Sequence, residues 1–124
     1  MKGTVATDIR VLVVEDSDDH RGLLKVYFEK AGCIVEAAAT AEEAIVAYAD
    51  RTPELAVIDL VLPGMDGWEL IKHLQRDVPT CAIAVTSVLD PWRFPIVHAT
   101  LPKPFTRADV LQVLEDTVPR WERL

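Results

Sequence analysis

Five short runs of apolar and often β-branched residues recur along the chain. They occupy residues 9–14 (IRVLVV), 33–39 (CIVEAAA), 55–59 (LAVID), 81–85 (CAIAV) and 96–101 (IVHATL). Runs of this length and composition are typical of strands that are buried on both faces of a sheet. The pattern therefore predicts five strands.

Between and after these runs, apolar residues recur at the spacing of amphipathic helices. The first predicted helix begins after Ser17 or Asp16 and ends at Gly32. The second opens with Thr40 and Glu43, which form the sequence pattern of a capping box. The residues predicted to face the core are His20, Leu23, Leu24, Tyr27, Phe28 and Ala31 in the first helix, Ala41, Ala44, Ile45 and Tyr48 in the second, Leu70, Ile71 and Leu74 in the third (residues 67–77), and Val110, Val113, Leu114 and Thr117 in a last helix capped by Thr106.

Strands that alternate with helices predict a parallel sheet with helices on both faces, which is a doubly wound α/β fold of the flavodoxin type with strand order 2-1-3-4-5. One connection departs from this pattern. Only nine residues separate Thr86 from Ile96, and Pro91 and Pro95 are among them. A full helix does not fit there, so we predict a single turn or an irregular loop. Trp92, in this stretch, either forms an exposed partner surface or folds back onto the sheet, and the same holds for Phe94.

Length and composition indicate one ordinary domain of 124 residues, in which residues 1–8 form a loose leader and residues 119–124 a short tail. The net charge of −7 argues against a nucleic-acid partner, which would require a basic face. No apolar run approaches the length of a membrane span, and the first ten residues lack a signal-peptide core. We therefore expect a soluble cytoplasmic protein.

The two cysteines and the remaining histidines give no evidence of a disulfide or zinc site. Cys33 and Cys81 fall on the second and fourth strands, which are not neighbours in the predicted order. His73 and His98 lack metal-ligand spacing to each other or to the cysteines.

Polar side chains that are far apart in the sequence follow the ends of the predicted strands. Glu15 and Asp16 follow the first strand, Asp59 ends the third, Thr86 follows the fourth and Lys103 comes shortly after the fifth. Ligands of open α/β sheets bind beyond the carboxyl ends of the strands, so these groups are expected to converge. Two unit charges 4 Å apart repel by about 4 kcal/mol at an effective dielectric constant of 20. A divalent cation such as Mg²⁺ would relieve this repulsion among the carboxylates.

Four segments in this order, VLVVEDSDD, VIDLVLPGMDGWELI, AIAVTS and LPKPF, resemble the receiver domain of bacterial two-component response regulators. The resemblance extends from about residue 9 to residue 118. It implies that Asp59 accepts a phosphoryl group and that Mg²⁺ is the cofactor. Asp16 would bind the metal directly and Glu15 mostly through water. The main-chain carbonyl of Val61 would be the third protein ligand.

The same resemblance implies that Thr86 is the switch hydroxyl, that Lys103 binds the phosphoryl group, and that the Lys103–Pro104 peptide bond is cis. It also implies that a histidine kinase or a histidine phosphotransfer protein donates the phosphoryl group and that a downstream target protein reads the modified surface. On this basis the chain is a signalling module rather than a turnover enzyme.

Two features depart from the family pattern. Thr100 stands where receivers usually carry an aromatic switch residue, and the connection between the fourth and fifth strands is short. These departures favour one alternative, a scaffold that binds a partner without phosphorylation. A hydrolase that uses Asp59 is a further alternative, but the sequence offers no further positioned base for it. The apolar Val61 and Val88 flank the expected site and predict slow dephosphorylation, because neither side chain can position an attacking water.

Overall fold

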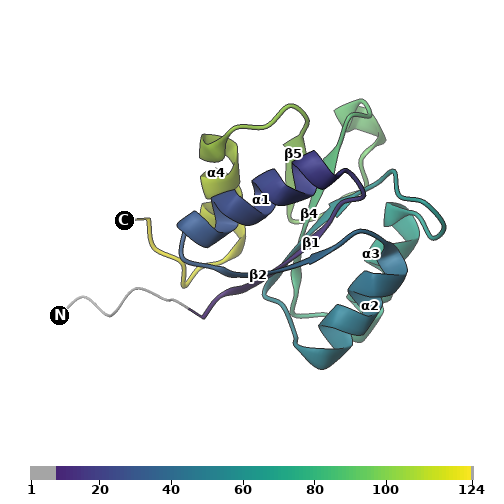
Figure 1. The fold of residues 1–124 in the computed structure, drawn as a ribbon, viewed down its shortest axis with the longest axis horizontal. Coiled ribbons are helices and arrows are strands. Elements are labelled where there is room, and N and C mark those ends of the chain that lie inside the picture. Colours follow the sequence, from purple (N-terminus) through teal and green to yellow (C-terminus); the bar gives the residue numbers. More distant parts are fainter. Residues whose placement is uncertain (1–7, 124) are drawn as a thin grey trace.

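A computed structural model describes residues 8–123, which fold into five parallel strands and four α-helices (Figure 1). The strands are β1 (Arg10–Val14), β2 (Ile34–Ala38), β3 (Leu55–Asp59), β4 (Ala82–Ser87) and β5 (Ala99–Pro102). The helices are α1 (Asp18–Lys30), α2 (Ala41–Asp50), α3 (Gly67–Asp77) and α4 (Arg107–Thr117), and a 3₁₀ turn, η1 (Pro91–Arg93), lies between β4 and β5. The strand order is β2-β1-β3-β4-β5. The doubly wound fold and its strand order are therefore confirmed.

The sheet separates two apolar cores. Helices α1 and α4 lie on one face, and α2 and α3 lie on the other (Figure 1). Alternate residues of β1 serve the two sides: Val11 and Val13 pack in the first core, whereas Leu12 and Val14 pack in the second. This alternation follows from the two-residue period of a strand. Both faces of β1 and β3 are buried, as their continuous apolar runs predict.

Capping residues fix where the helices begin. Thr40 accepts a hydrogen bond from the backbone N–H of Glu43 as predicted, but the Glu43 carboxylate accepts from Ala39 rather than from Thr40. The reciprocal capping box occurs instead at α4, between Thr106 and Asp109. Helix α1 is followed by Gly32 at a φ of 95°, which confirms the predicted stop.

The connection between β4 and β5 contains only the three-residue turn η1, which confirms the prediction for this stretch. Phe94 packs against the α2/α3 core, whereas Trp92 is 82% exposed. Phe94 therefore folds back onto the core, whereas Trp92 is exposed and its role as a partner surface stays a prediction.

Three sequence-based expectations require correction. The fifth strand begins at Ala99 rather than at residue 96, because Ile96 is fully exposed and precedes the sheet pairing. The helical spacing predicts that Leu23 faces the core, but its side chain is 39% exposed. Leu24 and Phe28 form the buried side of α1 instead. The predicted tail carries Trp121, which is buried in the α1/α4 core. Residues 1–7 of the predicted leader lie outside the described residues.

No helix within residues 8–123 combines the length and the apolar character that crossing a bilayer would require.

Candidate functional site

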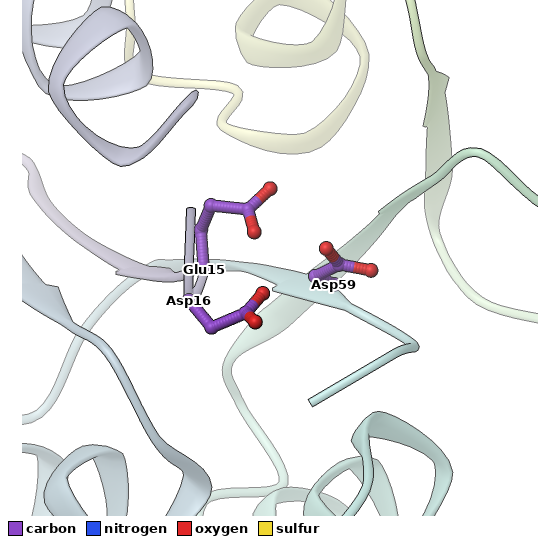
Figure 2. A group of neighbouring side chains, drawn as sticks. All are labelled: Glu15, Asp16 and Asp59. Atoms are coloured by element: carbon purple, nitrogen blue, oxygen red, sulfur yellow. The ribbon is translucent and has the colours of Figure 1, made fainter. Parts of the chain in front are cut away.

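The predicted carboxylates do meet at the carboxyl edge of the sheet. Glu15 and Asp16 follow β1, and Asp59 is the last residue of β3. One carboxylate oxygen from each lies within 4.8 Å of the other two. Figure 2 shows the three side chains at this edge, with those of Glu15 and Asp16 extending toward the side on which Asp59 lies. Glu15 and Asp59 are buried, whereas Asp16 is exposed, so the cluster opens to solvent on the Asp16 side.

Lys103 joins this cluster from the segment after β5. Its Nζ lies 2.9 Å from Asp59 Oδ2 and also contacts Glu15 Oε1. The lysine side chain is only 7% exposed, so the ammonium group is held between two buried carboxylates. The peptide bond between Lys103 and Pro104 is cis, as expected.

A close approach between α3 and β3 fixes the backbone around Asp59. A Cβ atom at Gly67 would lie 2.3 Å from the carbonyl oxygen of Asp59 and 2.6 Å from the Cα of Leu60. The Gly67 N–H donates to the Leu60 carbonyl at 3.0 Å, and the Val61 N–H donates to Asp59 Oδ1 at 3.0 Å. Only glycine fits at the start of α3, and the turn that it permits orients the Asp59 carboxylate.

Thr86 lies beside Asp59 because the two residues are register partners in β4 and β3. Its hydroxyl is buried, and no described group forms a hydrogen bond with it. The neighbouring Ser87 is used differently, since its hydroxyl accepts from the Leu89 N–H at 3.2 Å. Thr86 does not cap the next element, and its hydroxyl remains available to a group bound at Asp59.

The electrostatics of the site reflect the burial of two acids beside one cation. Burial raises the pKa of Glu15 to about 7; Lys103 opposes this shift and Asp59 adds to it. Burial alone would lower the pKa of Lys103, but its contacts with Glu15 and Asp59 raise it above the usual value. The contacts of Lys103 with the two carboxylates favour its charged form, and the raised pKa of Glu15 reflects the cost of burying that acid beside Asp59.

The remaining candidate residues occupy structural positions. His20 is partly packed: its ring lies 6.1 Å from that of Phe105, and its side chain is 41% exposed. His98 has a role that its sequence context did not reveal, because its Nδ1 accepts the Ile83 N–H at 2.9 Å. Cys33 and Cys81 are buried free thiols.

The residues present fit a hard divalent cation. Within residues 8–123, the carboxylate trio is the group of potential ligand side chains that lie close enough together to bind a metal. Its donors are all oxygen atoms, two of the acids are buried, and the third faces solvent. Mg²⁺ prefers such carboxylate ligands and retains several waters, which the open side would accommodate.

Two curated proteins illustrate the sequence similarity. The chain is 40% identical over 80 residues to an uncharacterized 14.6 kDa protein of Leptolyngbya boryana, covering 62% of this chain and 61% of that protein. It is 36% identical over 85 residues to the transcriptional regulatory protein PhoP of Escherichia coli K12, covering 68% of this chain and 38% of PhoP. The chain thus corresponds to less than two thirds of either relative.

Solved structures share the fold. The response regulator receiver domain protein of Clostridium thermocellum superposes with a TM-score of 0.80 at 18% identity, covering 90% of this chain and 95% of that one. NtrX of Brucella abortus superposes with a TM-score of 0.84 at 24% identity, covering 90% of this chain and 28% of NtrX. Residues 11–115 match the response regulator receiver domain family. The chain is therefore a receiver domain of the two-component response regulators.

Proposed function

We propose that this receiver accepts a phosphoryl group on Asp59 from a phosphohistidine donor, in the presence of Mg²⁺. The proposal rests on the groups that surround the Asp59 carboxylate: one cation, two acids and one hydroxyl. Asp59 is held by Lys103, lies within 4.8 Å of two further acids, and faces a buried hydroxyl without a partner. A purely structural aspartate would need neither the acidic neighbours nor the unsatisfied hydroxyl.

The transfer is a displacement at phosphorus. A carboxylate oxygen of Asp59 attacks the phosphorus atom, the P–N bond to the donor imidazole breaks, and the bonding electrons remain on the imidazole nitrogen. Mg²⁺ bound by Asp16 and Asp59, with Glu15 acting through water and the Val61 carbonyl as a further ligand, would offset the charge of the phosphoryl oxygens.

Two residues would then hold the product. The Lys103 ammonium already contacts Asp59 at 2.9 Å and would pair with a phosphoryl oxygen. The Thr86 hydroxyl would donate to a second phosphoryl oxygen and satisfy its missing hydrogen bond. These new contacts at β4 and after β5 would bias the domain toward the conformation that a target protein binds.

The direct test is covalent labelling with acetyl phosphate and Mg²⁺, followed by intact mass spectrometry. We expect a mass increase of one phosphoryl group that is lost in Asp59→Asn and after removal of the metal with a chelator. Asp50→Asn is the matched control, because Asp50 is an exposed aspartate at the end of α2. No adduct on the native chain would contradict the proposal and favour a scaffold that works without phosphorylation. Sustained turnover of an organic substrate would favour a hydrolase.

A second experiment tests the role of Thr86. We expect Thr86→Ala to accept the phosphoryl group but to show smaller amide NMR shifts in β4 and β5 on labelling. Ser87→Ala is the control, since the Ser87 hydroxyl is engaged with the backbone of Leu89. Equal shifts in native protein and Thr86→Ala would remove Thr86 from the proposed switch.

The phosphorylated state should be long-lived. Val61 and Val88 are 51% and 74% exposed and bring only apolar side chains to this edge of the sheet, so neither can orient an attacking water. A half-life of seconds in the labelling experiment would contradict this expectation.

A further inference from the structure

A hollow lies against α4 and the end of α1, among residues that the phosphoacceptor proposal does not use. It has a volume of about 210 Å³ and is lined by Lys30, Arg107, Leu111, Trp121 and Arg123, among others. Figure 1 shows the C-terminal segment passing the end of α1 after it leaves α4. The hollow is therefore built from three separate parts of the chain.

Packed core residues give this hollow a fixed wall. Trp121 is 6% exposed, and its Nε1–H donates to the Ala31 carbonyl at 2.9 Å. Leu111 is likewise buried in the same apolar core. The apolar wall of the hollow is therefore held by the fold, whereas Lys30, Arg107 and Arg123 are exposed at its rim.

The lining is basic although the chain carries a net charge of −7. Lys30, Arg107 and Arg123 line the hollow together with one acid, Glu122. Arg123 pairs with Glu115 at 2.8 Å. Among residues 8–123, no group forms an ion pair or hydrogen bond with the side chain of Lys30 or Arg107. Other cations of this chain do find acids, such as Arg120 with Glu54.

Helix electrostatics favour the position of Lys30 and disfavour that of Arg107. Lys30 is the last residue of α1, where the negative end of the helix favours a cation. Arg107 is the first residue of α4, where the positive end of the helix disfavours a cation. An anion in the hollow would offset this unfavourable placement of Arg107.

We propose that the hollow binds a compact oxyanion of the phosphate class, contacted by Lys30, Arg107 and Arg123. A guanidinium fork matches phosphate geometry and can donate two parallel hydrogen bonds to it. Typical pockets for drug-sized ligands measure about 300–1,000 Å³, so this hollow suits one or two phosphate groups rather than a whole nucleotide. Binding would tie the end of α1 to α4 and to the C-terminal segment.

Thermal unfolding with a chelator present tests the proposal through linkage, because an anion that binds the folded state raises the unfolding temperature. Pyrophosphate, inorganic phosphate and ADP are compared with sodium chloride at matched ionic strength, in the Asp59→Asn background so that the phosphoacceptor carboxylate is absent. We expect pyrophosphate to stabilise the protein most. An equal effect of ADP and pyrophosphate would indicate recognition of the phosphates alone, whereas a larger effect of ADP would contradict a site for a compact oxyanion.

Charge-neutralising variants localise the effect. We expect Lys30→Gln/Arg107→Gln to weaken the apparent affinity for pyrophosphate by about tenfold or more. Lys72→Gln/Arg93→Gln is the matched control, because it removes the same charge from exposed residues of α3 and η1. Equal stabilisation of both double variants would overturn the site, as would the absence of any stabilisation beyond that of sodium chloride.

The Trp121 indole gives a readout that does not depend on stability. We expect its N–H resonance to shift as pyrophosphate is added, whereas the indole of the exposed Trp92 serves as an internal control. Equal shifts of both indoles would mean non-specific association and would contradict the proposal. Because these measurements do not involve phosphorylation of Asp59, their failure would leave the proposed function intact.

Discussion

The chain reaches β4 through an eleven-residue helix, α3, and leaves it through the three-residue turn η1. In the first crossover, α3 buries Leu70, Ile71 and Leu74 and approaches β3 closely at Gly67. In the second, Phe94 packs against the core while Trp92 and Ile96 are 82% and 100% exposed.

The difference between the two crossovers shows which parts of the fold position the residues of the candidate site. Asp59 and Thr86 lie at strand ends, and Lys103 comes directly after β5. All three are positioned by the sheet and by the turn before α3. The second crossover can therefore be short without separating them, and its surface is where this receiver departs most from a regular alternation of strands and helices.

The largest expected effect comes from breaking the first crossover. Gly67→Ala should lower the free energy of unfolding by about 3 kcal/mol, because the new Cβ would overlap the backbone of Asp59 and Leu60. Gly22→Ala is the matched control. Nothing lies within 4 Å of a Cβ at that helical position, and alanine favours a helix more than glycine does. The free energy of unfolding of this variant should therefore rise by about 0.5–1 kcal/mol. Urea denaturation measures both, and a loss at Gly67 no greater than at an ordinary surface site would contradict the proposed close approach.

In the second crossover, one aromatic residue should matter far more than the other. Phe94→Ala should cost about 2 kcal/mol of unfolding free energy, since Phe94 is partly buried against the α2/α3 core. Trp92→Ala should change it by less than about 0.5 kcal/mol because the side chain is exposed. Both variants should accept a phosphoryl group as the native chain does. Loss of labelling in either would show that the crossover supports the candidate site.

His98 should make a smaller contribution to the same crossover. It accepts the Ile83 N–H, and its own N–H donates to the Ile83 carbonyl at 3.0 Å. His98→Ala would leave the Ile83 N–H without its acceptor, at a cost of about 1–2 kcal/mol. His73→Ala removes an imidazole that contacts Arg76 on α3 and should be nearly neutral. Equal stability changes in the two variants would argue against the His98 contact.

The smallest effect concerns pH and the first crossover, where the Tyr48 hydroxyl of α2 donates to Asp77 of α3. Hydrogen bonds from Arg76 and then Tyr48 lower the pKa of Asp77 from 3.8 to about 2. The stability gained from this carboxylate is therefore fully present above about pH 4 and is lost as the pH falls toward 2.

The contribution of Tyr48 to stability depends on pH in the opposite direction to that of Asp77. Burial and its bond to Asp77 raise the pKa of Tyr48 from 10 to about 12, so its contribution is present below pH 10 and lost as the pH rises through 12. The stability difference between native protein and Tyr48→Phe should be largest between about pH 4 and pH 10 and should shrink on both sides. A difference that does not vary with pH would contradict the Tyr48–Asp77 contact.

Local sequence patterns were sufficient for most of the fold. The strand at residues 55–59 and the helix at residues 67–77 have the predicted limits. For the helix the reason is clear, because Asp66 and Gly67 open it and Pro79 follows it. The start of β5 could not be predicted in the same way. Residues 96–98 are as apolar as a strand, and only their three-dimensional surroundings show that pairing with β4 begins at Ala99.

The convergence of the candidate site followed from topology, since strand ends of a parallel sheet meet at one edge. The functional roles of Asp59, Thr86 and Lys103 remain predictions that the labelling experiments test. The role of His98 was not predictable, because a side chain that accepts from the backbone of a neighbouring strand leaves no periodic signal. The basic hollow was equally hidden, since Lys30, Arg107 and Arg123 are widely separated in sequence.

The burial of Trp121 has a practical consequence for where this domain ends. The family match stops at residue 115, yet Trp121 is buried in the α1/α4 core. Its indole N–H donates to the carbonyl of Ala31, the C-cap residue of α1. Trimming the protein at the boundary of the match would remove two members of this core, Val118 and Trp121. Anyone preparing a shorter version, or fusing a reporter to this end, should keep the residues through 121.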